Sequence, residues 1–186
     1  AADFAALRTI YLTYAKPMGE GLSATAAARA TLAEDMTTLT DLTEIFVQNP
    51  SSPSPMHYGS RIVPDGDQLW ITTGEHSAAP ARENAQDVTK TWGKVVRLMA
   101  DGSVPADNPF AGQGGAADQV WTLGHRNIQG AALAPDGALW TLEHGPMGGD
   151  ELNRIERGAN YGWPEVSYGL NYDGTPVGTG EAHGEG

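Results

Sequence analysis

The chain has 186 residues, a formal net charge of −12 at pH 7 and no cysteine. Its acidic balance argues against nucleic acid as a partner, because nucleic acids bind basic surfaces, and it leaves many carboxylates that suit hard cations. The absence of cysteine excludes disulfides, thiolate zinc sites and cysteine nucleophiles. No stretch approaches the ~18 consecutive apolar residues that a membrane-spanning helix needs.

The first part of the chain predicts short strands joined by turns, in keeping with the 24 Gly and 12 Pro of the sequence. We expect strands near residues 9–15, 25–33 and 42–48, followed by a Pro/Ser-rich loop at 48–55. The alanine-rich stretch 24–33 has helical propensity, but the Thr residues and short turns around it favour a strand, and a helix stays the alternative. The opening segment lacks the basic region and the long apolar region of a signal peptide.

An internal repeat points to the architecture. Residues 62–72 and 133–141 share one pattern: an apolar strand, a Pro-Asp-Gly turn, and a second strand that carries Leu-Trp. Asp-Gly between apolar runs is a strong hairpin signal, because Gly tolerates a positive φ. A hairpin that recurs at long spacing is typical of a β-propeller. We expect four tryptophans to lie in the core, namely Trp70, Trp92, Trp121 and Trp140.

The chain is interpreted as one partial β-propeller domain over residues 1–186. Its blade-like units are about 1–50, 57–100 and 119–164, with a long Gly/Pro/Asp loop at 101–119 and a Gly-rich tail after residue 170. Known propellers close with ~4 or more blades, and closure is what removes sheet edges. Three such units therefore predict either a piece of a larger propeller or copies that combine.

The stretch 124–164 carries an excess of polar groups. Two clusters, GHRN at 124–127 and EHGPMGGDE at 143–151, lie at either end of one short apolar segment. A core hairpin has no need of so many Gly, His, Arg and carboxylate groups. This pattern favours a functional site where strands meet loops.

Several motifs in a fixed order resemble one family. They are GHRNIQG, EHGPMGGDELN and GANYGWP in the stretch 124–164, together with HYGSR at 57–61, WGKVVRL at 92–98 and DGSVPADNP at 101–109. In these motifs the chain is similar to the soluble pyrroloquinoline-quinone (PQQ) dependent sugar dehydrogenases, the glucose/sorbosone or aldose sugar dehydrogenase family. The resemblance implies an all-β, six-bladed propeller of which this chain covers about three central blades. One departure is Ile128, which stands where the family commonly has Pro.

The resemblance implies roles for four residues. His57 would be the general base, a task that suits the near-neutral pKa of an ordinary histidine. Arg126 and Asn127 would hold the quinone, and Arg126 would stabilise the negative charge that grows during hydride transfer. Asp150 would face the active site. The alternatives are a loop histidine without a role, a surface ion pair for Arg126 and a solvated acid at position 150.

The resemblance also implies calcium. The carbonyl oxygens of Gly145 and Pro146 would bind the Ca²⁺ that holds the cofactor, with His144 lining the same pocket. Glu151 and the carbonyl of Tyr161 would form a second, structural calcium site. A simple Gly-Pro turn is the alternative at the first site, and a solvated acid at Glu151 is the alternative at the second.

The activity implied by the resemblance is oxidation of the anomeric hydroxyl of an aldose sugar to a lactone, with electrons passing to an external acceptor. A periplasmic or secreted location is implied in the same way. The alternative is a non-catalytic, calcium-stabilised scaffold, because no Lys or Arg follows Arg157 and the family's further cationic cofactor ligands come from later blades. A calcium-dependent propeller hydrolase is a third reading. The particular sugar, the acceptor and the oligomeric state are left open.

Overall fold

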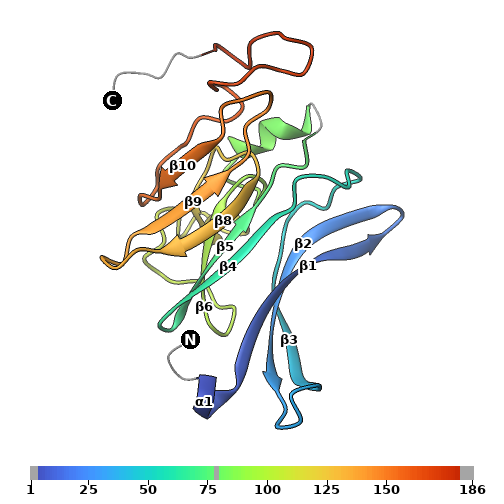
Figure 1. Ribbon diagram of the computed structural model, residues 1–186, viewed down its shortest axis with the longest axis vertical. Helices are drawn as coiled ribbons and strands as arrows, with labels where there is room; N and C mark the ends of the chain where they lie inside the picture. Colours follow the sequence, from blue (N-terminus) through green and yellow to red (C-terminus); the bar gives the residue numbers. More distant parts are fainter. Residues whose placement is uncertain (1–3, 78–79, 181–186) are drawn as a thin grey trace.

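The computed structural model describes residues 4–77 and 80–180, and it is almost entirely β-structure. Three antiparallel sheets follow one another along the chain and lie side by side (Figure 1). The predicted all-β class is therefore confirmed. The first sheet contains β1 (Thr9–Gly19), β2 (Leu22–Leu32) and β3 (Leu39–Val47). The second sheet contains β4 (Gly59–Asp65), β5 (Gln68–Thr73), β6 (Val95–Met99) and β7 (Val120–Thr122). The third sheet contains β8 (Ile128–Leu133), β9 (Leu139–Glu143) and β10 (Glu151–Arg154). Short helical turns are α1 (Phe4–Leu7), η1 (Ala81–Ala85) and η2 (Ala117–Gln119).

The alanine-rich segment is a strand, as predicted. It forms β2, the middle strand of the first sheet, paired with β1 on one side and β3 on the other. Ala24, Ala26, Ala27, Ala28 and Ala30 are all buried. Tertiary pairing thus overrides the helical propensity of alanine, because strands on both sides of this segment pair with its backbone.

The second sheet lies between the other two, and its strands are buried on both faces. Leu69 and Ile71 of β5 belong to one core cluster with Phe46 of the first sheet. Trp70, between them in sequence, belongs to another cluster with Ile128 of the third sheet. Successive side chains of a strand point to opposite faces, so a single strand joins both cores.

The two predicted Pro-Asp-Gly hairpins both form, as β4–β5 and β8–β9. Their glycines adopt positive φ angles, 58° at Gly66 and 82° at Gly137. The tryptophans that follow do not share an environment: Trp70 is 8% exposed, whereas Trp140 is 36% exposed. The core prediction was wrong for Trp140, because burial alternates along β9 and Trp140 points to the outer face with Leu142.

Strand β7 changes the predicted grouping of strands. Its residues Val120–Thr122 pair with β6 of the second sheet, although the sequence analysis placed position 119 onward in the third unit. The preceding loop is tied to the same sheet by Asn108, whose Nδ2 donates to the carbonyls of Arg97 and Asp118 at 3.0 and 2.9 Å. The chain therefore returns to its own sheet before it crosses to the next one.

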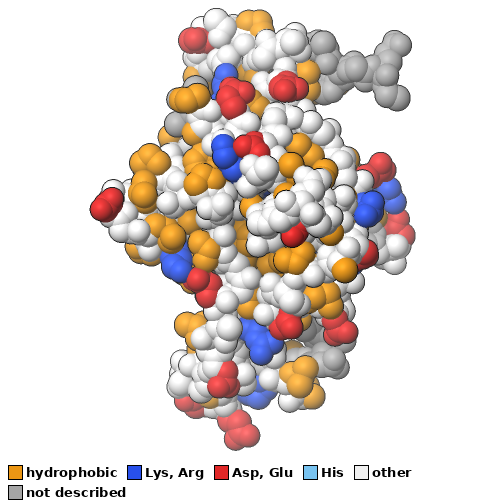
Figure 2. Space-filling view, turned by 180° about the vertical axis from the view of Figure 1, so that it is seen from behind, with side chains coloured by type: hydrophobic (Ala, Val, Ile, Leu, Met, Phe, Trp, Pro, Cys, Tyr) orange, Lys and Arg blue, Asp and Glu red, His pale blue; other side chains and the backbone are white. Residues whose placement is uncertain are grey.

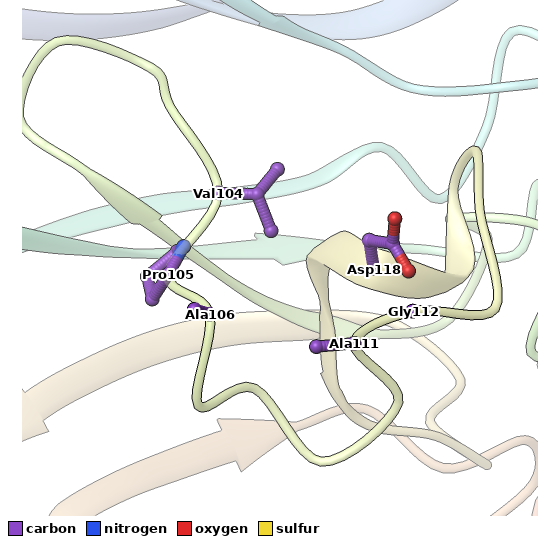
Figure 3. A pocket seen from close by; sticks show the side chains of 6 residues that line it. All are labelled: Val104, Pro105, Ala106, Ala111, Gly112 and Asp118. Carbon is purple, nitrogen blue, oxygen red and sulfur yellow. The ribbon is translucent and has the colours of Figure 1, made fainter.

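The surface carries apolar side chains as well as charged ones. On the face shown in Figure 2, hydrophobic side chains are spread among Lys, Arg, Asp and Glu. The loop between β6 and β7 forms a shallow hollow of ≈ 360 Å³ (Figure 3) that shares no lining residue with the polar site described below. Within residues 4–77 and 80–180, no helix is long and apolar enough to cross a membrane.

Candidate active site

His57 is held beside a buried carboxylate. Its Nδ1 lies 3.1 Å from Oε2 of Glu75, and the side chain of Glu75 is fully buried while that of His57 is 15% exposed. The backbone of His57 has φ = 50°, and its carbonyl packs so tightly that a Cβ on Gly74 would come within 2.0 Å of it. A histidine whose one ring nitrogen is fixed by a carboxylate presents the other nitrogen in a defined orientation, which is what a general base needs.

Asn127 ties the His57 loop to the Arg126 loop. Its Oδ1 accepts the backbone N–H of Gly59 at 3.1 Å and an N–H of Gln129 at 2.9 Å. The backbone of Asn127 also bridges to Gly74, and the N–H of Glu75 donates to the carbonyl of Arg126 at 3.1 Å. Two segments far apart in sequence, one before β4 and one before β8, are thereby fixed at one place.

Arg126 projects into a small cavity. The cavity has a volume of ≈ 60 Å³ and is lined by Glu75, Arg82, Arg126, Pro146, Trp163 and Asn171, among others. Arg126 is buried; its Nη1 donates to the carbonyl of His144 at 3.0 Å, while its Nε has no hydrogen-bond partner. Its guanidinium lies 5.3 Å from the ring centre of Trp163, and within the described part of the chain it has no carboxylate partner.

A buried carboxylate binds the loop that carries Arg126 through hydrogen bonds. Glu143, at the end of β9, accepts the backbone N–H of Arg126 at 2.8 Å and lies 3.0 Å from Nδ1 of His125. Burial alone would raise the pKa of Glu143, but the His125 ring and the Arg126 N–H together hold that pKa below its usual value. Glu143 therefore acts as an anionic anchor for the turn that carries Arg126.

The turn at Gly145 and Pro146 carries two backbone carbonyl groups that have no hydrogen-bond donor among the described residues. A Cβ on Gly145 would lie 2.2 Å from the carbonyl oxygen of Gly148, so only glycine fits there. The turn is braced by Met147, which exchanges backbone hydrogen bonds with Leu170 at 2.9 and 3.1 Å. The carbonyl oxygens of Gly145 and Pro146 accept no hydrogen bond from the described residues, and free carbonyl oxygens are the ligands that Ca²⁺ takes readily.

Glu151 and Tyr161 each share a neighbouring side chain with Glu143, which is Asn153 for Glu151 and His125 for Tyr161. Nδ2 of Asn153 donates to both Glu143 and Glu151 at 2.9 Å, which brings the two carboxylates together. Burial and the Glu143 charge raise the pKa of Glu151 to about 7. The Tyr161 ring stacks on His125 at 4.6 Å. Among the described residues there is no group of three or more His, Cys, Asp or Glu that would hold a metal, so any cation here needs backbone carbonyls as ligands.

His144 and Asp150 lie on the exposed rim. Their side chains are 62% and 66% exposed, and His144 Nδ1 is 3.8 Å from Asp150 Oδ2. Asp150 also accepts the backbone N–H of Gly145 at 2.9 Å. Neither residue lines the cavity that Arg126 occupies. Asp150 closes the turn at Gly145, and a catalytic role for it stays a prediction.

Three contributors were not singled out from the sequence: Glu75, Arg82 and Glu143. A signal existed for two of them, because the Glu-His pairs at 75–76 and 143–144 follow the repeated strands at matching places. In the structure each of these glutamates accepts from a histidine outside its own pair, His57 for Glu75 and His125 for Glu143. Arg82 lies in the short helical turn η1, where the sequence has no comparable pattern.

Comparison with known proteins shows the family of the chain. The family model for glucose / sorbosone dehydrogenase matches residues 1–186. The chain belongs to the glucose/sorbosone dehydrogenase family. It is 43% identical over 187 residues to aldose sugar dehydrogenase YliI of Escherichia coli (strain K12), a match that covers 100% of this chain and 49% of that protein.

Solved structures of the family share the fold. A glucose dehydrogenase crystal structure superposes with a TM-score of 0.91 at 45% identity, covering 98% of this chain and 53% of that one. The PQQ-bound aldose sugar dehydrogenase of Streptomyces coelicolor superposes with a TM-score of 0.74 at 29% identity, over 93% of this chain and 48% of that one. The chain thus spans about half the length of these relatives, and its three sheets are consecutive blades of a propeller of the sugar dehydrogenase type.

The described residues fit a quinone cofactor with calcium. Arg126 lines the cavity and has a buried, unpartnered Nε, which suits an anionic, oxygen-rich ligand. Pro146 lines the same cavity, and the carbonyl oxygens of Gly145 and Pro146 accept no hydrogen bond from the described residues. Arg126 would hold the quinone, and the two carbonyls would hold the cation.

Proposed function

We propose that the chain forms part of a PQQ-dependent sugar dehydrogenase that oxidises the anomeric hydroxyl of an aldose to a lactone. The observation that carries this proposal is the shared position of Glu75, which contacts His57 and also lines the cavity with Arg126. Glu75 thus links the proposed base to the cavity that Arg126 lines, and hydride abstraction from an alcohol requires both a base and a cation for the developing negative charge.

His57 accepts the proton of the sugar hydroxyl at Nε2 in this proposal, because Nδ1 faces the Glu75 carboxylate. Glu75 fixes the orientation of the ring and stabilises its positive charge once the proton has arrived. PQQ, when bound, would supply the two-electron acceptor for the hydride of the anomeric carbon, and Ca²⁺ would supply Lewis acidity.

Arg126 stabilises negative charge on the ligand side of the cavity. Its buried guanidinium is oriented by the His144 carbonyl and by Trp163, so it pays little reorganisation during the reaction. The carbonyls of Gly145 and Pro146 would hold the cation. Glu151 and the Tyr161 carbonyl would hold a second calcium, and His144 and Asp150 would border the entrance. We further propose a periplasmic or secreted location and an external electron acceptor, as the family resemblance implies.

One assay tests the proposal. The purified chain is supplied with PQQ and Ca²⁺, and reduction of a dye is followed with glucose and with other aldoses. We expect His57→Ala to lower kcat by at least about 100-fold, in the range of a lost general base. The exposed Glu156→Ala variant, whose side chain is 66% exposed, serves as the control. Equal activity of His57→Ala and the wild type would refute the mechanism.

A cofactor-free, calcium-stabilised scaffold is the competing function. It needs only a cation at the backbone carbonyls of Gly145 and Pro146, which accept no hydrogen bond from the described residues. It predicts no change in PQQ absorbance on mixing with the chain, together with an increase in thermal stability with Ca²⁺. Quinone binding separates the two proposals before any turnover is measured.

A further inference from the structure

Three unpartnered donors surround one cavity. Among the described residues, only five buried side-chain N or O atoms lack a hydrogen-bond partner, and three of them are Nε of Arg82, Nε of Arg126 and Nε1 of Trp163. All three residues line the same ≈ 60 Å³ cavity. An unsatisfied buried donor is costly, so donors that gather at one cavity indicate a missing acceptor.

The arrangement of the two arginines strengthens this point. The guanidinium of Arg82 lies 5.7 Å from the Trp163 ring centre and that of Arg126 lies 5.3 Å from it. Two cations that share one indole repel each other unless an anion lies between or beside them. The nearest carboxylate to Arg82 is that of Glu83 at 3.7 Å, and this carboxylate is 60% exposed.

The remaining groups of the cavity do not supply that anion. Glu75 lines the cavity, but its carboxylate is engaged by His57 and by the backbone N–H of Ser77. Asn171 accepts from Nη1 of Arg82 at 3.0 Å and leaves Nε of Arg82 without a partner. The donors left without a partner on the residues that line the cavity are thus two guanidinium N–H groups and one indole N–H.

We propose that Arg82, Arg126 and Trp163 form a carboxylate-binding subsite. Guanidinium groups match carboxylate geometry through parallel N–H···O bonds, and the indole N–H supplies a neutral donor. Two sources share this chemistry: a carboxylate of PQQ, which is a tricarboxylate, and the carboxylate of an acidic sugar such as a uronate. The first source rests on the proposed function, whereas the second does not.

The indole N–H of Trp163 gives a direct NMR signal for ligand binding at this subsite. The chain has five tryptophans, so the indole region of a ¹H–¹⁵N spectrum is sparse, and Trp163→Phe identifies the Trp163 resonance. The ¹⁵N-labelled chain is titrated with PQQ, with PQQ trimethyl ester and with D-glucuronate. We expect a ligand that carries the carboxylate to move the Trp163 indole signal downfield, because a free donor gains an acceptor.

Arginine variants measure how much Arg82 contributes to the affinity for the ligand. Arg82→Gln is expected to weaken the binding of the active ligand about tenfold or more, and Arg82→Lys to restore part of it, because the charge returns without the planar fork. Arg154→Gln is the matched control, since Arg154 is 51% exposed and pairs only with Glu156. Its affinity should stay within about twofold of the wild type.

The outcomes distinguish the two proposals. A shift with PQQ and none with its ester supports the subsite and the proposed function together. A shift with glucuronate alone supports the subsite and contradicts quinone binding. Quenching of protein fluorescence by PQQ without a Trp163 shift or an Arg82→Gln effect overturns the subsite while the proposed function stands. The absence of any response to PQQ and to glucuronate overturns both the subsite and the proposed function.

Discussion

Removal of the Glu143 carboxylate is the sharpest test of how the site is held. Glu143 is 4% exposed, and it accepts three hydrogen bonds, from Arg126 N–H at 2.8 Å, Asn153 Nδ2 at 2.9 Å and His125 Nδ1 at 3.0 Å. Loss of one member of a buried, paired network costs about 3–5 kcal/mol. We expect this loss for Glu143→Ala, since two buried donors, the Arg126 N–H and His125 Nδ1, are left without this acceptor.

The measurement is equilibrium unfolding in urea with a parallel thermal scan. For a chain of this length a loss of 1 kcal/mol lowers Tm by about 2–4 °C, so the expected decrease is about 6–20 °C. Glu156→Ala is the control, because its carboxylate is exposed and its ion pair with Arg154 is worth about 0–1 kcal/mol. A Glu143→Ala variant within about 1 kcal/mol of the wild type would refute the anchoring role.

The same network predicts a pH dependence. The folded pKa of Glu143 is lowered from its usual value of 4.5, so its stabilising contribution is present above that value and is lost as the pH falls through the folded pKa. Glu143→Gln keeps the volume but cannot ionise. The gap in unfolding free energy between the wild type and Glu143→Gln is therefore expected at pH 7 and should close as the solution is made more acidic. A constant gap across that range would contradict the assignment.

Three further predictions follow from packing. Lys94 is fully buried and donates to three backbone carbonyls at 2.6–2.9 Å, so Lys94→Met is expected to lose at least about 2 kcal/mol in urea unfolding. Gly74→Ala would place a Cβ 2.0 Å from the His57 carbonyl; we expect about 1–3 kcal/mol of destabilisation together with reduced dye turnover, and normal turnover would contradict it. Trp70→Ala is expected to cost about 3–5 kcal/mol and Trp140→Ala less than about 1 kcal/mol, and equal costs would refute the assignment of their faces.

Local patterns predicted much of the fold. The Asp-Gly turns at 65–66 and 136–137 give hairpins because glycine alone takes the required positive φ without strain. The alanine-rich strand was also predicted correctly. The pairing of β7 with β6 was not, because a strand of 3 residues carries no pattern that names its neighbour. The exposure of Trp140 was missed for a similar reason: a repeat in sequence specifies a hairpin and not the layer that packs on each of its faces.

For the site, the motifs named His57, Arg126, Asn127 and the Gly145–Pro146 turn, and the structure brings these together around one polar region. The motifs did not reveal the Glu75 and Glu143 carboxylates that hold them, nor the Arg82 side chain that enters the same cavity from η1. These contacts join residues from 17 to 89 positions apart in the chain, and no local periodicity encodes such distances.

The sequence by itself determined which residue types are present, where the chain turns and which family motifs it carries. It did so because turn geometry and side-chain chemistry are local properties. Only the tertiary structure decided which donors remain unpartnered: Nε of Arg126 and Nε1 of Trp163 lack acceptors because the second and third sheets, the 80–85 turn and the 160–171 segment close around them. Burial and hydrogen-bond satisfaction are properties of the packed whole, and the candidate site is defined by them.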